Sequence, residues 1–137
     1  MKRIGSIIFV ALVFSLFIAC FAIAESYEVM PCADTEFNSA TTLLKSSKQV
    51  SFRAVTYNVK SSISVTACWL EQKNDDGSWT TVCSLNTPSA VSQNDFSYSA
   101  TMDYSSEIGT GTYRIRATYN ADGHTITRYS NERTFSN

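Results

Sequence analysis

One imidazole and a few carboxylates are the residues in this chain whose types could support acid–base chemistry. His124 is the single histidine among 137 residues, and it follows Asp122-Gly123, a dipeptide typical of tight turns. Nucleophilic catalysis needs a hydroxyl or thiol beside a positioned base, and no cysteine here stands in a recognisable nucleophile motif. We therefore expect His124 to be a solvated turn residue and not a catalytic base.

Two adjacent aspartates raise the question of glycoside hydrolysis or calcium binding. Asp75 and Asp76 lie within Asn74-Asp75-Asp76-Gly77, where aspartates usually accept hydrogen bonds from the turn backbone. The segment lacks the spacing and the terminal Glu of an EF-hand loop, and the chain has no Gly-rich phosphate-binding loop. The sequence therefore predicts no catalytic residue, no cofactor and no metal site.

Binding is the activity that the remaining side chains favour. Two Trp and seven Tyr could supply a flat platform for a sugar or a peptide, although a domain this small needs most aromatic side chains in its core. Trp79 is the best candidate for a ligand platform, because it lies at the base of a predicted hairpin. We expect it to share a face with Leu70 and Leu85.

A group of arginines could attract an acidic partner. Arg114, Arg116 and Arg128 are expected to share an outer sheet face, which is usually solvated but could bind an anionic glycan or a polymer such as teichoic acid. The chain has 11 Lys+Arg, 12 Asp+Glu and a net charge of −1, so it lacks the basic excess of a nucleic-acid-binding protein. We therefore expect a local attraction only. The sequence does not identify the partner of the protein: cell-wall glycan and protein are the candidates, and nucleic acid is not expected.

The first 24 residues have the three-part layout of a secretory signal peptide. Lys2 and Arg3 precede an apolar run over residues 7–23, which ends in the small-residue cleavage pattern Ala22-Ile23-Ala24. The sequence therefore predicts a signal peptide over residues 1–24, one domain over residues 25–137, and a secreted protein.

Two alternatives place the chain at a membrane. An uncleaved signal segment would act as an N-terminal anchor. Phe17-Ile18-Ala19-Cys20 resembles a bacterial lipobox, and that resemblance implies acylation at Cys20 and a lipid-anchored surface protein.

Three cysteines remain in the predicted mature chain, namely Cys32, Cys68 and Cys83. Exported chains usually bridge their cysteines. A four-residue loop at 74–77 would place Cys68 directly opposite Cys83, within disulfide reach, whereas a loop one residue shorter would turn them to opposite faces. We favour a Cys68–Cys83 disulfide. Pairing of Cys32 with either of them, a free Cys32 and fully reduced thiols stay open.

Apolar and polar residues alternate through the mature chain with the period of half-buried β-strands. About seven strands are predicted, near 35–44, 48–57, 62–72, 79–85, 95–104, 112–120 and 124–135. Type I turns with a left-handed glycine should close hairpins at 74–77 and 120–123. The expected core-facing residues are Val50, Phe52, Ala54, Thr56, Ile63, Val65, Ala67, Trp69, Phe96, Tyr98, Ala100, Met102, Tyr104, Tyr113, Ile115, Ala117 and Tyr119. This pattern favours an antiparallel β-sandwich.

The segment Gly109-Thr110-Gly111-Thr112-Tyr113 and the strand after it resemble immunoglobulin-like and fibronectin type III-like modules. In those folds a glycine-containing corner leads into a strand headed by a tyrosine, whose hydroxyl bonds back to the corner backbone. Tyr113 matches this tyrosine corner, and residues 129–135 look like the final strand. The hairpin at Asp76-Gly77-Ser78-Trp79 is similar to hairpins of small secreted bacterial sandwich proteins. The resemblance implies an immunoglobulin-like β-sandwich and no particular binding residues.

Together these observations predict a secreted, non-enzymatic binding or structural module at or outside a bacterial cell surface. The alternatives are a lipid-anchored surface protein and a small secreted enzyme or inhibitor.

Overall fold

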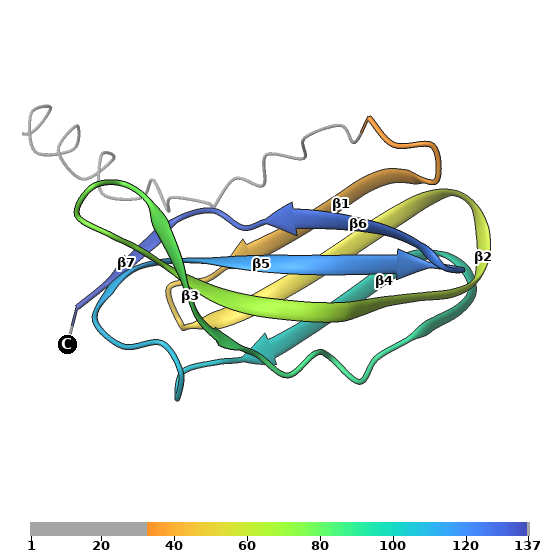
Figure 1. The fold of residues 1–137 in the computed structure, drawn as a ribbon. Coiled ribbons are helices and arrows are strands. Elements are labelled where there is room, and N and C mark those ends of the chain that lie inside the picture. The colour runs from red at the N-terminus through yellow and green to blue at the C-terminus, as the bar shows by residue number, and fades with distance from the viewer. Residues whose placement is uncertain (1–32, 137) are drawn as a thin grey trace, which may run out of the picture.

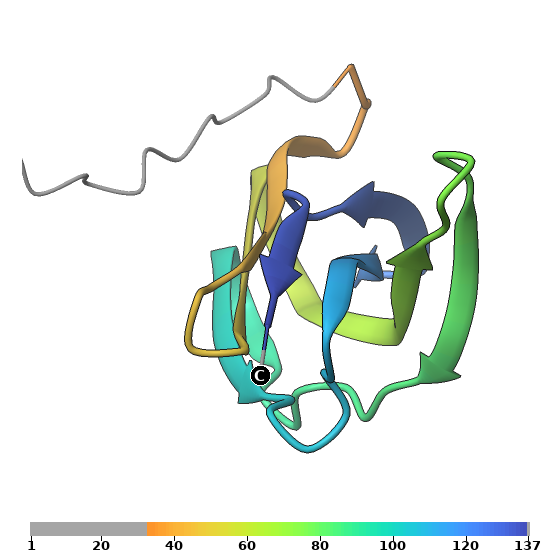
Figure 2. The ribbon, with the colours of Figure 1, turned by 90° about the vertical axis from the view of Figure 1, so that its left-hand side faces the viewer.

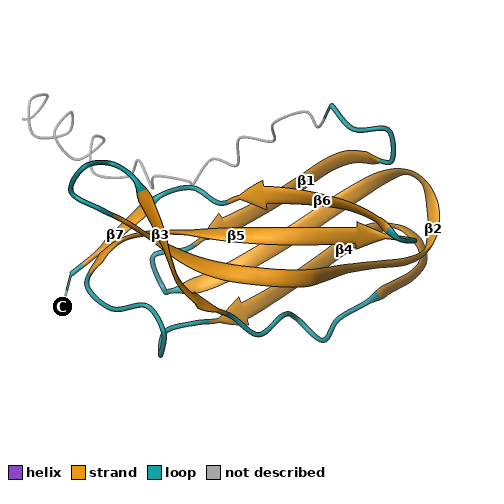
Figure 3. Cartoon of the chain, viewed as in Figure 1, coloured by secondary structure: helices purple, strands orange, loops and turns teal. Residues whose placement is uncertain are grey.

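The computed structural model describes residues 33–136, which form seven antiparallel strands and no helix (Figure 3). The all-β antiparallel prediction is confirmed for these residues. The predicted signal peptide, Cys20, Cys32 and the start of the predicted domain lie outside the described residues. The strands are β1 (Phe37–Leu44), β2 (Gln49–Lys73), β3 (Trp79–Ser84), β4 (Ser92–Asp103), β5 (Gly111–Ala121), β6 (His124–Tyr129) and β7 (Arg133–Phe135).

The longest strand, β2, organises the whole sheet. We predicted two strands, over 48–57 and 62–72, but the structure has one strand of 25 residues. Its first half pairs with β1 and β4, and its second half pairs with β3 and β5. Because β2 bends between the two halves, the sheet curls around its core as a half-barrel (Figures 1 and 2).

The end of the chain differs from the prediction as well. The strand expected over 124–135 is divided into β6 and β7, which both pair with β5. Between them, the Asn131 side chain leaves the sheet to accept a hydrogen bond from Leu44 N at 2.9 Å and donate one to Leu44 O at 3.1 Å. These bonds join the interruption to the end of β1.

The alternation of side chains holds best in β5 and in the first half of β2. Tyr113, Ile115, Ala117 and Tyr119 are all buried, as are Val50, Phe52, Ala54 and Thr56. In β4, Tyr98 is buried and Ala100 and Met102 pack against the core. Phe96 is the exception, because it is 55% exposed where we predicted an inward residue. The ladder between β2 and β4 shifts register there, between Val55 and Lys60.

A β-bulge reverses the faces of the second half of β2. The register with β5 shifts between Val65 and Ala67, so Thr66 is an extra residue with no paired residue in the ladder. An extra residue turns every following side chain to the other face. The prediction that Ala67 and Trp69 point inward is therefore wrong: Cys68 and Leu70 enter the core instead.

A second bulge, in β3, corrects the predicted cysteine register. The hairpin takes the register of the shorter loop: Asn74 faces Ser78, whose carbonyl oxygen accepts a hydrogen bond from Asn74 N at 2.8 Å, and Lys73 pairs with Trp79. Val82 is then the extra residue, so Cys83 lies opposite Leu70 and not opposite Cys68. Both Cys68 and Cys83 are free thiols in this structure.

The two predicted turns use glycine differently. Gly77 has a φ of 84°, as expected for the left-handed residue that closes the first hairpin. The second hairpin joins Ala121 to His124 through Asp122 and Gly123 alone, with φ values of 51° and 92°. Positive φ at both central residues is the mark of a type I′ turn, so our type I prediction is wrong at this position.

The curled sheet closes across its core through Tyr119. From β5, its hydroxyl donates to Thr41 O at 2.7 Å and lies 2.8 Å from Thr42 Oγ1, both on β1. Tyr119 is fully buried, and its burial raises the pKa of the hydroxyl, with the hydrogen bond to Thr42 acting in the opposite direction. These bonds satisfy a polar group that would otherwise be costly inside an apolar core.

Candidate functional site

The outer face of β3, β2, β5 and β6 gathers cationic and aromatic side chains in register. Trp69 and Glu71 on β2 pair with Arg116 and Arg114 on β5, respectively. Because directly opposed residues share a face, these four side chains project from the same outer surface. Tyr129 on β6 pairs with Arg116, and Trp79 on β3 pairs with Lys73, which extends the row to both neighbouring strands.

These side chains stack as alternating cations and rings. The Arg114 guanidinium carbon lies 4.2 Å from the centroid of the Trp79 ring and 4.2 Å from that of Tyr129, so it is held between two rings. Arg116 lies 4.2 Å from the ring centroid of Trp69. Lys73 Nζ lies 5.6 Å from the Trp79 ring. We refer to this set as the arginine–aromatic ladder, comprising Trp69, Lys73, Trp79, Arg114, Arg116 and Tyr129.

One carboxylate bridges the two arginines of the ladder. Arg114 Nε donates to Glu71 Oε2 at 2.7 Å. Arg116 Nε lies 2.9 Å from Glu71 Oε1, close enough for an ion pair although not aligned as a hydrogen bond. Glu71 is only 6% exposed. By contrast, most residues of the neighbouring strand β3 are exposed. The carboxylate is therefore covered by the ladder that it holds together.

The ladder retains hydrogen-bonding capacity for an anion. Both arginines use Nε toward Glu71, and within residues 33–136 their terminal amino groups make no further hydrogen bond. A guanidinium can present two parallel N–H groups to a carboxylate, sulfate or phosphate. Lys73 is neutralised by Glu132 at 2.8 Å. Since Glu71 balances only one of the two arginines, the face keeps a positive excess.

Some predicted site residues belong to this face and others do not. Trp79 is partly buried against Arg114, but it does not share a face with Leu70 and Leu85, which lie in the core. Arg128 is also misassigned, because it pairs with buried Ala117 and so lies on the opposite side of the sheet from the other two arginines.

Sequence reasoning missed Glu71 and Tyr129 as members of the site. A signal for Glu71 was present, since Arg114 and Arg116 stand two residues apart on one strand and two adjacent cations favour a carboxylate on the next strand. No such signal marks Tyr129. Its ring contacts Arg114, although the residue that pairs with Tyr129 in the β5–β6 ladder is Arg116.

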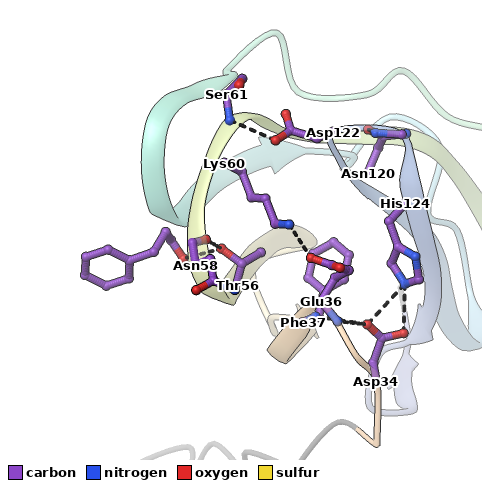
Figure 4. Close-up of polar contacts among 12 residues, drawn as sticks. Asp34, Glu36, Phe37, Thr56, Asn58, Lys60, Ser61, Asn120, Asp122 and His124 are labelled. Carbon is purple, nitrogen blue, oxygen red and sulfur yellow. Dashed lines mark hydrogen bonds and ion pairs between the residues drawn. The ribbon is translucent and has the colours of Figure 1, made fainter.

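A second group of polar contacts lies at the bend of β2, where β1 and the β5–β6 turn meet it (Figure 4). Asp122 accepts hydrogen bonds from Ser61 N at 3.0 Å and Ser62 N at 2.9 Å, which fixes the bend to the type I′ turn. Lys60 forms an ion pair with Glu36 just before β1. We call this set, together with Asp34 and His124, the corner cluster.

His124 is more enclosed than we expected for a solvated turn residue. Its Nε2 lies 3.0 Å and 3.1 Å from the two carboxylate oxygens of Asp34, and its ring lies 6.1 Å from that of Phe37. Within residues 33–136 the hydrogen bonds of its ring go to Asp34, with no hydroxyl or thiol among the partners. The arrangement orders the chain before β1 and holds no nucleophile beside the imidazole.

Stability in acid should depend on Asp34. Hydrogen bonds from the backbone of Phe37 and from His124 lower its pKa from 3.8 to about 2, despite some opposing desolvation. Because the folded-state pKa is the lower one, this stabilisation is complete above about pH 4 and is lost as the pH falls through about 2. We expect Asp34→Asn to lower the free energy of unfolding by about 1 kcal/mol at pH 7, after allowance for solvent screening, and to have little effect at pH 2.

Urea unfolding of Asp34→Asn at both pH values would measure this difference, with Asp75→Asn in the exposed turn as the control. An equal loss of stability at pH 7 and pH 2 would show that the carboxylate charge is not responsible.

The remaining predicted residues take simple roles. Tyr113 donates a hydrogen bond from its hydroxyl to Thr110 O at 3.3 Å, the kind of bond expected of a tyrosine corner. Asp76 accepts bonds from Ser78 N and Oγ within its own turn.

The described residues contain no group of three or more His, Cys, Asp or Glu placed to hold a metal ion. Nor does this part of the chain hold a helix long and apolar enough to cross a membrane.

Comparison with known proteins adds no assignment. No family model, curated protein or solved structure matches the chain.

Proposed function

We propose that this protein is an exported, non-enzymatic binding module whose arginine–aromatic ladder takes an acidic glycan or a similar anionic polymer. The observation that carries the proposal is the pair of guanidiniums, Arg114 and Arg116, held on aromatic rings with their terminal amino groups unpaired within the described chain. Fixing both arginines before binding lowers the entropic cost of binding a ligand.

The spacing of the ladder suits a polymer with repeated anionic groups. Arg114 and Arg116 are two residues apart on β5, so their Cα atoms are separated by roughly 7 Å along the strand. Tyr129 is 53% exposed beside them and offers an apolar contact for a sugar ring. A chain of acidic sugars or phosphate-linked units could meet both cations and the ring at once.

We also propose that the curled sheet is an immunoglobulin-like β-sandwich. In this interpretation β1, the first half of β2 and β4 form one layer, and β3, the second half of β2, β5 and β6 form the other. The pairings of β2 and the hydrogen bond of Tyr113 support it. The ladder then occupies the solvent side of the second layer.

Binding should be selective for acidic ligands and should depend on both ladder arginines. We expect Arg114→Ala or Arg116→Ala to weaken binding to an acidic glycan by tenfold or more, since a charge-assisted hydrogen bond contributes about 1.5–3 kcal/mol. Affinity should also fall as salt concentration rises. Titration calorimetry with acidic and neutral glycans of equal length would measure both effects.

The matched control is Arg53→Ala, which removes the same charge from an exposed arginine on the first half of β2. Equal losses from Arg53→Ala and Arg114→Ala would reduce the ladder to a general charge effect. Turnover of a polymer substrate by the purified protein would contradict the non-enzymatic assignment.

Export leads to a defined mature N-terminus. We expect intact-mass measurement of the protein from its native host to give a chain that begins at Glu25, after removal of 24 residues. A chain that begins at an acylated Cys20 would instead make the protein lipid-anchored. Recovery of the full-length chain from the membrane fraction would indicate an uncleaved anchor.

A further inference from the structure

The bulge in β3 brings two thiols to the same side of the sheet. Without an extra residue at Val82, Cys83 would point outward with Trp69; with it, Cys83 lies opposite the core residue Leu70. Cys68 precedes Leu70 by two residues on β2, so it also faces the core. The two cysteines are therefore diagonal neighbours on adjacent strands.

The surroundings of the two thiols are unequal. Cys68 is 1% exposed, and its Sγ lies 3.9 Å from the hydroxyl of Tyr104. Burial raises the pKa of Cys68 to about 11, and the nearby Cys83 adds to the increase. Cys83 is only partly buried and packs on the edge of the core. A reagent in solvent can therefore reach Cys83 before Cys68.

The strand that carries Cys83 can move by the small distance that a bond requires. Diagonal neighbours have Cα atoms roughly 7–8 Å apart, and a disulfide accepts up to about 7 Å. The strand β3 has six residues and, among the strands of residues 33–136, pairs with β2 alone. A shift of about 1 Å at such an edge breaks no pairing on its other side.

We propose that a small-molecule disulfide oxidises this pair and links Cys68 to Cys83. The thiolate of Cys83 attacks the reagent, forms a mixed disulfide and releases one thiol. The thiolate of Cys68 then attacks the Cys83 sulfur, forms the protein disulfide and releases the second thiol. Two protein thiols lose two electrons and two protons, and the reagent is reduced to two thiols. The bond would fix β3, the strand that carries Trp79, to the core, and its formation does not depend on what the ladder binds.

The test uses the reduced full-length chain, oxidised glutathione and peptide mapping by mass spectrometry. In the parent protein we expect a mixed disulfide at Cys83 first, followed by a linked peptide pair containing Cys68 and Cys83. In Cys68→Ser the glutathione adduct at Cys83 should persist, and in Cys83→Ser Cys68 should stay unmodified. Circular dichroism of both variants would verify that they remain folded.

Four results would overturn the proposal, three of them from the mapping of the folded protein. The first is a glutathione adduct at Cys83 that persists in the parent protein at the same level as in Cys68→Ser. The second is a disulfide from Cys83 to Cys32 in place of Cys68. The third is modification of Cys68 in the folded Cys83→Ser variant. Recovery of the linked pair only after denaturation would likewise show that the native fold does not bring the thiols together.

Discussion

Replacing Tyr119 by Phe is expected to lower the free energy of unfolding by about 2 kcal/mol, with the side-chain volume almost unchanged. The substitution removes the hydroxyl that bonds Thr41 O at 2.7 Å and lies 2.8 Å from Thr42 Oγ1. Thr42 is itself buried, so its hydroxyl would lose a partner in a place that water does not reach. An unpaired buried polar group adds its desolvation cost to the lost bond.

The larger truncation separates the packing contribution from the hydrogen bonds. Tyr119→Ala should cost about 4 kcal/mol, because it also leaves a cavity where one of the largest fully buried side chains stood. Such a loss is a large fraction of the stability of a domain of this size. Urea unfolding followed by tryptophan fluorescence would measure both variants.

The matched control is Tyr129→Phe, which removes the same hydroxyl from a tyrosine that is 53% exposed. We expect its effect on stability to stay within about 0.5 kcal/mol. If Tyr119→Phe were equally neutral, the bonds between β5 and β1 would not be what closes the curled sheet.

The parts of this fold that the sequence predicts are those in which side-chain direction is set locally. In β5, apolar residues at every second position from Tyr113 to Tyr119 can satisfy one buried face only as a strand, and all four are buried. The first half of β2 follows the same rule from Val50 to Thr56. For these segments the apolar pattern alone identifies the core.

The errors arise where a single extra residue changes the direction of all that follow. Thr66 and Val82 are both β-branched residues of the kind common throughout these strands, so residue type does not mark the two bulges. The bulge at Thr66 turns Trp69 outward, and without it Trp69 could not stack on Arg116. The candidate site was therefore only partly predictable: its arginines and Trp79 are visible in the sequence, but their assembly depends on register.

Replacing Glu71 by Ala tests whether that assembly is a single unit. The substitution leaves Arg114 and Arg116 side by side without the carboxylate that lies 2.7 Å and 2.9 Å from their Nε atoms. Removing one partner of a buried ion pair costs about 3–5 kcal/mol, but both arginines are partly exposed and can regain hydration. We therefore expect a loss of about 2 kcal/mol in the free energy of unfolding.

The same variant should change the ladder itself, because repulsion would draw Arg114 out from between Trp79 and Tyr129. We expect altered tryptophan emission in the folded state and weaker binding of acidic glycan, although the variant has a more positive charge. A purely electrostatic surface would respond in the opposite direction and bind more tightly. Glu132→Ala is the control, because it makes the same charge change at an exposed carboxylate that pairs with Lys73 at 2.8 Å. Its cost should stay within about 0.5 kcal/mol, and tighter glycan binding by both variants would show that orientation of the arginines does not matter.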